Sequence, residues 1–359
     1  MSRVVMAALL LAACGAQPAP PPSPAASPSA TPIAAPRDSN ARPAPAEPRT
    51  FGDWAVACDN GLRCEMASLG AEGGGFPTWT MALSRGAGPA GAYEIALDSL
   101  NDDKGTPATI VIDGRRHAVA GNGLSGPAAA TIAGALATGR ALTLHDAAGT
   151  TLATVSLKGA SAALRFIDAA QGRAGTVTAT VATGPAAAVP PAPPLPTVVA
   201  ITPGGTAASP SVPQWGDMRR VAQCDDRMSE SDGWKPRLHA LGGGATLILL
   251  PCSAGAYNEI DALFVLRDGK VTPAQVDAPS GFAPDAQEAT APVRSVINGS
   301  FDGGLLGSYG KARGLGDCGI AQSFAWDGAR FRLTEQKVMS ECRGNPHYLT
   351  VWRAKVVRR

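Results

Sequence analysis

The sequence of 359 residues has no long apolar run and no excess of one charge. The apolar stretch Val4–Leu11 is far shorter than the roughly 20 residues that cross a bilayer as a helix, so a permanent transmembrane anchor is not expected. Lys and Arg number 31 against 29 Asp and Glu, and the two signs are interspersed. A nucleic-acid partner is not expected either, because phosphate binding needs a concentrated basic face. The short basic end Lys355–Arg359 is interpreted as a frayed, solvated terminus.

Recognisable motifs for catalysis and metal binding are also missing. The serine-containing strings Gly123–Gly126 and Asn298–Ser300 do not match a nucleophile elbow, and Ser125 is better interpreted as a helix cap. The cysteines have no C-x2-C spacing, so a zinc site is not predicted. The histidines lie far apart and are interpreted as structural or solvated: His117, His145, His239 and His347. The sequence therefore predicts no catalytic residue, no metal and no cofactor.

The beginning of the chain has the pattern of a bacterial lipoprotein signal. Arg3 precedes an apolar stretch, and small residues lead to Leu11-Ala12-Ala13-Cys14. We expect residues 1–13 to be a signal peptide and Cys14 to carry the lipid, palmitate included, because the lipid is joined through the cysteine sulfur. A plain secretory peptide is the alternative. Because Gly15 rather than an aspartate follows the cysteine, we expect the outer membrane rather than the inner one.

Two low-complexity stretches rich in Pro, Ala and Ser divide the rest of the chain. Residues 14–50 are predicted to be a tether and residues 184–214 a linker. Both are expected to be extended and mobile, because segments of this composition bury too little apolar surface to offset the loss of chain entropy on folding. The segments between them, residues 51–183 and 215–359, are predicted to be two folded domains.

The first folded segment has mostly the alternating pattern of strands. Asp113-Gly114 joins the strands Thr109–Ile112 and Arg115–Val119 in a predicted hairpin. Two helices are expected, one of them running from Ser125 to about Thr138 and the other over Ser161–Asp168. Further strands are expected over residues 54–58, 78–83, 93–97, 141–144 and 151–155.

The second folded segment is also predicted to be mainly strand, with few helices. Asp268-Gly269 and Asp327-Gly328 mark two more hairpins. The predicted fold class is therefore mainly β with some helix (α+β), as two antiparallel-sheet-rich domains joined by the Pro/Ala-rich linker. Other strands of this segment are expected over residues 245–250, 262–266 and 350–354.

Cysteine usage fits an oxidising compartment. Of seven cysteines, Cys14 is set aside for lipid, which leaves six that can all pair. Cys58 with Cys64 is predicted because the turn signal Asp59-Asn60-Gly61 places them across a hairpin. Three connectivities are open for the second group, of which sequential pairing is favoured: Cys224 with Cys252, and Cys318 with Cys342.

Several short motifs together are similar to those of one protein family. The combination resembles domain of unknown function family eleven seventy-six, which consists of proteobacterial envelope proteins, and the likeness spans roughly residues 51 to 359. The Phe-Gly-Asp-Trp to Cys pattern also resembles the invasion-associated locus B family of exported proteins. The resemblance implies an exported protein and no catalytic residue. The motifs are Phe51–Asn60, Val155–Asp168, Gln171–Arg173, Cys252–Asn258 and Gly314–Gly319.

Three polar constellations are candidate ligand sites. The glycine-rich loop Gly314–Gly319 holds Asp317, with positive charge from Lys311 and Arg313, although the favoured interpretation is an ordinary tight turn. A second polar loop, close to Cys252, holds Tyr257 and Asn258. The third group is interpreted as an ordinary helix end with its charges: Asp168, Gln171 and Arg173.

Taken together, the sequence favours a periplasm-facing lipoprotein that binds another envelope protein or a cell-wall component. It would contact the membrane through its lipid and have no catalysis of its own. One alternative is an enzyme acting on cell wall or polysaccharide, with Asp317 and Glu335 as acid and base. Another is a hydrolase inhibitor that inserts a polar loop.

Overall fold

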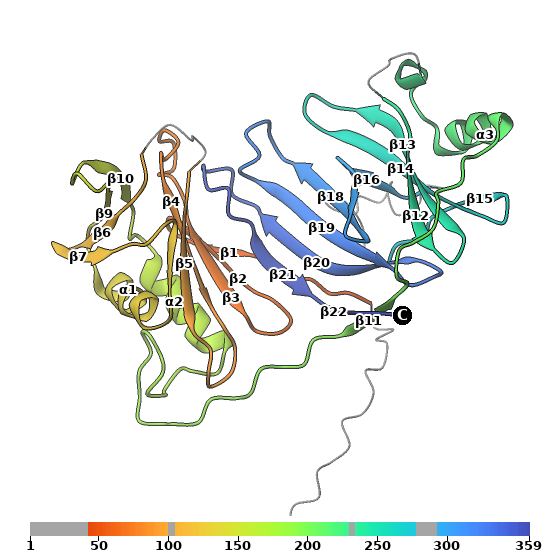
Figure 1. Cartoon of the computed structure of the whole chain (residues 1–359). Helices are drawn as coiled ribbons and strands as arrows, with labels where there is room; N and C mark the ends of the chain where they lie inside the picture. The colour runs from red at the N-terminus through yellow and green to blue at the C-terminus, as the bar shows by residue number, and fades with distance from the viewer. Residues whose placement is uncertain (1–41, 100–104, 230–233, 278–292) are drawn as a thin grey trace, which may run out of the picture. The chain divides into compact units, whose positions relative to one another are not determined.

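The computed structural model describes residues 42–99, 105–229, 234–277 and 293–359. The chain divides into two units, Met1–Pro36 and Arg37–Arg359, and the described residues all belong to the second. They are mainly β-strand, with three α-helices and one 3-10 helix (Figure 1). The predicted fold class is confirmed. Cys14 and the predicted signal peptide lie outside the described residues.

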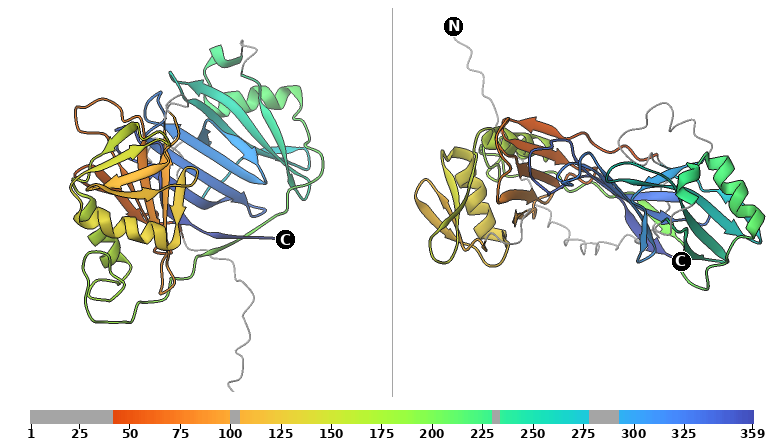
Figure 2. Two further views of the ribbon diagram at one scale, coloured as in Figure 1. Left: turned by 60° about the vertical axis from the view of Figure 1, so that its left-hand side comes forward. Right: turned by 90° about the horizontal axis from the view of Figure 1, so that it is seen from above.

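The N-terminal half is built on a six-stranded antiparallel sheet with two helices against one face. Trp54, Met66 and Met81 from this sheet pack with Ile132 of α1 (Gly126–Thr138) and Leu164 of α2 (Ala160–Ala170). Figures 1 and 2 show both helices beside the sheet. The strands in spatial order are β1 (Arg49–Phe51), β2 (Trp54–Cys58), β3 (Cys64–Ser68), β4 (Thr80–Arg85), β5 (Tyr93–Asp98) and β8 (Gly123–Ser125).

A four-stranded antiparallel sheet completes this core. Asp113 and Gly114 both have positive φ, 47° and 81°, as a two-residue primed hairpin turn requires, so the predicted hairpin is confirmed. Both predicted helices are also confirmed. Ser125 is the N-cap residue of α1, as predicted, although its side chain makes no capping hydrogen bond. The strands are β10 (Thr151–Val155), β9 (Leu142–His145), β6 (Thr109–Ile112) and β7 (Arg115–Ala118).

Two five-stranded antiparallel sheets face each other in the C-terminal half. Leu249 and Leu263 of one sheet pack against Leu306, Phe324 and Phe331 of the other. The first sheet contains β12 (Arg237–Gly242), β13 (Ala245–Ala254), β14 (Glu259–Arg267), β15 (Lys270–Pro273) and β16 (Ser295–Ile297). The second contains β17 (Ser300–Asp302), β18 (Leu305–Lys311), β19 (Gly319–Trp326), β20 (Phe331–Met339) and β21 (Leu349–Arg353). The hairpins predicted at Asp268-Gly269 and Asp327-Gly328 are confirmed.

The outer face of the first sheet carries a helix that the sequence did not lead us to expect. Met218 of α3 (Val212–Ala222) packs on Ile248 and Phe264, and the 3-10 helix η1 (Asp226–Ser229) follows it. The signal for α3 was present, since Ser211 and Gln214 form a capping box.

The C-terminal end and part of the Pro-rich stretch form a parallel strand pair. β11 (Thr197–Ala200) pairs in register with β22 (Lys355–Arg358). Val198 and Ala200 are buried against Ala325. The expectation of a frayed terminus is therefore wrong, and residues 197–200 are not a free extended segment. Along β11 every second residue is buried, so one face of this strand packs against the protein although the stretch is rich in proline overall.

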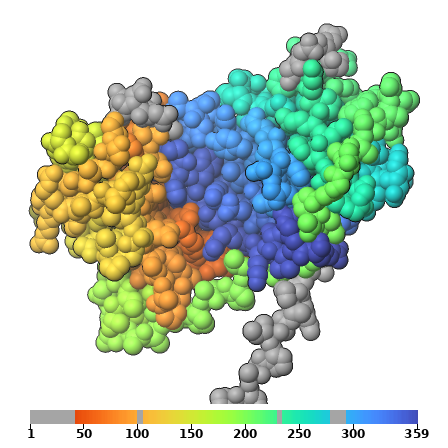
Figure 3. All heavy atoms as spheres, in the orientation of Figure 1, coloured from red at the N-terminus to blue at the C-terminus, as the bar shows by residue number. Residues whose placement is uncertain are grey.

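The N-terminal sheet also packs against the C-terminal half through its second face. Along β2, Trp54 and Val56 point into the helical core, whereas Ala55 and Ala57 lie in a separate cluster with Val351 of β21. The small alanine side chains leave room for the second layer of strands. The sheet is thus buried on both faces, and the surfaces of the two halves adjoin in Figure 3.

Three disulfides are present, with the pairing predicted from sequence: Cys58–Cys64, Cys224–Cys252 and Cys318–Cys342. Cys58 and Cys64 face each other across the β2–β3 hairpin. The bond between Cys318 and Cys342 joins the start of β19 to the segment that follows β20. This third bond lies beside the predicted ligand loop.

Candidate functional site

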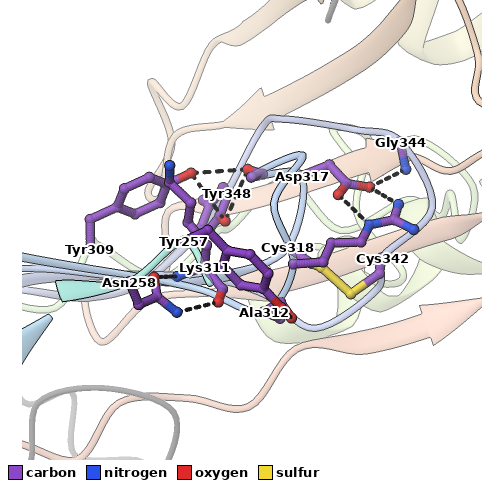
Figure 4. Close-up of a disulfide and its surroundings, with 12 residues drawn as sticks. Tyr257, Asn258, Tyr309, Lys311, Ala312, Asp317, Cys318, Cys342, Gly344 and Tyr348 are labelled. Carbon is purple, nitrogen blue, oxygen red and sulfur yellow. Dashed lines mark hydrogen bonds and ion pairs between the residues drawn. A yellow bond between two sulfur atoms is a disulfide. The ribbon is translucent and has the colours of Figure 1, made fainter. Parts of the chain in front are cut away.

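The predicted loop Gly314–Gly319 is organised around Asp317, which is fully buried. Arg313 donates two hydrogen bonds to its carboxylate, and the Gly344 N–H donates a third at 2.7 Å (Figure 4). Burial alone would raise the pKa of Asp317, but the bonds from Arg313 and Gly344 hold it below its ordinary value. Asp317 therefore fixes the loop to the segment after Cys342 and presents no free oxygen to a ligand.

The second predicted loop meets the first. The Asn258 side chain donates to the Lys311 carbonyl at 2.8 Å and accepts from the Lys311 N–H at 3.1 Å. Tyr257 donates to the carbonyl of Ala312 at 3.0 Å. The structure therefore brings all five predicted residues together, but it uses most of their polar groups to hold the two loops. Figure 4 shows Tyr257 and Asn258 alongside this segment.

An open cleft with a volume of about 420 Å³ lies at the edge of this loop. Its wall combines the end of β5 with strands of the last sheet and with the segment that precedes β21. The loop contributes Gly316, whose φ of +72° and closeness to Tyr309 favour glycine, because a Cβ there would lie 3.0 Å from the phenol oxygen. The lining residues are Asp98, Tyr309, Gly316, Ala321, Lys337, Pro346, His347 and Tyr348.

Two tyrosines of the cleft share one acceptor. Tyr309 and Tyr348 donate to the carbonyl of Gly316 at 3.0 and 3.1 Å, and their own oxygens lie 3.4 Å apart. Burial and the hydrogen bond with Tyr309 raise the pKa of Tyr348, so its hydroxyl stays protonated at neutral pH. The two rings meet edge to face, with centroids 5.8 Å apart.

His347 stands between two carboxylates. Its Nε2 lies 3.8 Å from Glu65 and its Nδ1 lies 3.8 Å from Asp98. Burial opposes ionisation of Glu65, but the nearby His347 ring, the hydrogen bond from the Thr350 N–H and the ion pair with Arg63 lower its pKa to about 2. The N-terminal sheet thus supplies a fixed negative charge behind the histidine.

One lysine, Lys337, lines the cleft, and a second, Lys311, lies beside its Tyr309. Lys337 pairs with Glu335 at 3.2 Å. The Lys311 ammonium lies 5.8 Å from the centroid of the Tyr309 ring, and within the described ranges no carboxylate lies within ion-pair distance of it. Lys311 is therefore the cation at this site that a ligand could neutralise.

Exposed apolar side chains surround the loop on its outer side. Phe76, Leu315 and Tyr257 are 57%, 49% and 40% exposed. The Arg313 guanidinium stacks on the Phe76 ring at 4.6 Å, and a Cβ on Gly314 would touch the Tyr257 ring at 3.5 Å. The loop thus borders both the polar cleft and these three exposed side chains, the apolar rim.

Two other sequence interpretations are corrected. Asp168, Gln171 and Arg173 are not an ordinary charged helix end, because all three are buried. Asp168 accepts hydrogen bonds from Arg85 and from the backbone of residues 180–182, so its role is to hold this loop. Asp317 has no accessible oxygen to act as an acid beside Glu335, which is itself paired with Lys337.

Sequence reasoning missed most of the cleft. Asp98, Tyr309, Lys337 and Tyr348 were not singled out, and His347 was interpreted as structural or solvated. A usable signal was Pro346-His347-Tyr348 shortly after Cys342, a polar aromatic segment held by a disulfide. In the described part of the chain, no group of three or more His, Cys, Asp or Glu is placed to hold a metal, and no helix is long and apolar enough to span a membrane.

The fold and the site define a mainly β, disulfide-bonded protein with a polar cleft beside a fixed loop. The chain belongs to the family described as "Protein of unknown function (DUF1176)", whose model matches residues 48–355. It is similar to "Uncharacterized protein YpfG" of Escherichia coli (strain K12), with 30% identity over 339 residues, 86% of this chain and 93% of that protein. No solved structure matches. The likeness to the invasion-associated locus B family stays a prediction.

Proposed function

We propose that this protein is a lipid-anchored, periplasm-facing component of the cell envelope whose cleft binds another envelope component. The cleft carries this proposal. Hydrogen bonds and a disulfide position its wall before any ligand arrives, and such preorganisation reduces the cost of binding.

The export part of the proposal has two supports. The three disulfides suit an oxidising compartment such as the periplasm. The lipoprotein signal pattern ending at Cys14 supplies the anchor, with the outer membrane favoured by Gly15. A tether of Pro-rich sequence between Cys14 and the first strand would let the cleft reach away from the membrane.

Binding is favoured over hydrolysis because the carboxyl groups proposed as acid and base already pair with basic side chains of the protein. Acid and base catalysis by Asp317 and Glu335 would need an accessible oxygen on each carboxyl, and Asp317 has none. Insertion of the polar loop into a hydrolase is also less favoured, since that loop is tied down by Asp317 and Asn258.

Capture of envelope components by the intact lipoprotein tests the proposal. Ala321→Phe should obstruct the cleft and remove partners that the wild-type protein recovers from solubilised membranes. Ala118→Phe, on an exposed position of β7, is the matched control and should capture normally. Equal capture by both folded variants would show that the cleft is not the binding site.

A further inference from the structure

We infer that the ligand of this cleft is a sugar chain that carries carboxylate groups. This inference rests on the proposed function and specifies its ligand. The sugar hydroxyls would bond to the tyrosine oxygens, a carboxylate would pair with Lys311, and carbon–hydrogen faces of the rings would lie on the exposed apolar side chains around the loop.

The hydrogen bonds of Tyr309 and Tyr348 set the polarity of the ligand. A phenol has one proton to donate and oxygen lone pairs to accept with. Both protons are engaged within the protein, because each phenol reaches the Gly316 carbonyl, at 3.0 and 3.1 Å, and one of them can instead donate to the other phenol oxygen at 3.4 Å. A ligand group that meets these oxygens must therefore donate a hydrogen bond.

The lysines require the opposite property. Lys337 in the lining of the cleft and Lys311 beside it are donors only, whereas the Asp98 carboxylate, like the tyrosine oxygens, is an acceptor. A ligand with closely spaced groups that both donate and accept satisfies this mixture. Neighbouring sugar hydroxyls have this property, whereas apolar side chains and phosphates do not.

The apolar rim provides a second kind of contact for a sugar, because exposed aromatic and aliphatic side chains can pack against the carbon–hydrogen face of a sugar ring. Three of the large apolar side chains exposed in the described residues gather at one loop: Phe76, Tyr257 and Leu315. The negative face of an aromatic ring attracts weakly positive hydrogen atoms, such as those on one face of a sugar ring. Arg313 covers one face of Phe76 and so helps to hold the ring in place.

Charge and size favour a sugar chain over a folded protein. His347 is flanked by two carboxylates and Lys337 is paired, which leaves Lys311 as the cation without an ion-pair partner among the described residues. A single carboxylate on the bound part of the sugar chain would neutralise the positive charge of Lys311. A cleft of about 420 Å³ suits a few sugar rings, whereas a stable protein interface buries about 1,200 Å² or more.

Calorimetric titration of the full-length protein in detergent tests the inference. The probes are oligogalacturonate, oligomannuronate and peptide-free glycan strands of peptidoglycan, with neutral cellohexaose and a poly-glutamate peptide for comparison. We expect saturable binding of at least one acidic glycan, weakened by salt, and much weaker binding of both comparison ligands. Binding of poly-glutamate alone would overturn the sugar assignment.

Variants separate the specific contacts from general effects. Lys311→Met should weaken binding of the acidic glycan roughly tenfold and reduce its salt dependence. Lys270→Met, at an exposed position of the β14–β15 hairpin, should leave both unchanged. Tyr309→Phe should weaken binding without altering the salt dependence, provided that thermal unfolding shows a folded variant.

Failure of this inference differs from failure of the proposed function. If none of the acidic glycans binds, but Ala321→Phe still abolishes capture from membranes, the cleft is a binding site and its ligand is not a sugar chain. If Ala321→Phe affects neither measurement, the proposed function itself is wrong.

Discussion

The Asn60 side chain holds the backbone of Arg353 by two hydrogen bonds. Its Nδ2 donates to the Arg353 carbonyl at 2.9 Å, and the Arg353 N–H donates to its Oδ1 at 2.8 Å. The Arg353 guanidinium also pairs with buried Asp59 in the same turn. The β2–β3 hairpin is thereby fastened to the end of β21, across 293 positions of sequence.

Removal of this contact should destabilise the whole protein. Asn60→Ala leaves two backbone groups without their partners, which costs about 1 to 3 kcal/mol of unfolding free energy. Urea unfolding followed by tryptophan fluorescence should still show one transition, because Trp54 and Trp352 report from the two halves of one packed unit. Asn122→Ala, at an exposed site, is the control. Two separate transitions in the wild type would contradict this view.

The stability of the protein should fall as pH rises from 5 to 8. Asp261 is fully buried, and one of its oxygens has no hydrogen-bond partner, while the other accepts from Arg237 at 2.6 Å and from the Gly299 N–H. Burial and the neighbouring Glu259 carboxyl group raise the pKa of Asp261 to about 7. A raised folded-state pKa stabilises the protein below the ordinary pKa of about 3.9, and this contribution is lost as pH passes 7.

Asp261→Asn should remove that pH dependence. The wild-type unfolding free energy should change by at most about 1.4 kcal/mol per pH unit from this group, and the variant should lose that slope. His239, whose pKa is lowered by burial and by Arg237, is present in both proteins. Its contribution to the pH dependence of stability is therefore the same in both and cancels when the two slopes are compared. Asp268→Asn, in an exposed hairpin turn, should keep the wild-type slope. The measurement is chemical denaturation at pH 5, 6, 7 and 8, and an unchanged slope in Asp261→Asn would refute the assignment.

The third disulfide should contribute more stability than the first. Cys318–Cys342 joins positions 24 residues apart, and Cys58–Cys64 joins positions 6 apart. By loop entropy the longer connection stabilises the fold by about 1 kcal/mol more. Replacement of both cysteines of each pair by alanine, compared by melting temperature, should show the larger loss for Cys318–Cys342. The reverse order would mean that local packing outweighs chain entropy.

Lipid attachment should depend on Cys14. Cys14→Ser cannot form the thioether, so we expect an unprocessed or soluble protein that incorporates no labelled fatty acid. The wild-type protein should fractionate with the outer membrane. Continued labelling of the variant would disprove the anchor, and recovery of the wild type in the inner membrane would contradict the sorting expectation.

The local signals in this sequence predicted local structure well. The Asp113-Gly114 turn and the Cys58–Cys64 pair depend on residues close together in the chain, where turn geometry limits the choices. The parallel pairing of β11 with β22 was missed because its partners lie more than 150 residues apart, at Thr197 and Lys355. Composition alone cannot show such a partner.

The sequence by itself determined the mainly β class, the Cys58–Cys64 disulfide and the loop around Asp317, and it favoured the pairing found for the other four cysteines. Only the tertiary structure decided that Asp317 is a buried anchor and that the cleft beside it is made from β5, β18, β19, β20 and the segment before β21. The alternation of Trp54 and Val56 with Ala55 and Ala57 predicts a strand, but not that its second face receives β21. Periodicity along a chain specifies which side chains share a face, whereas the packing of faces depends on long-range complementarity that no local pattern encodes.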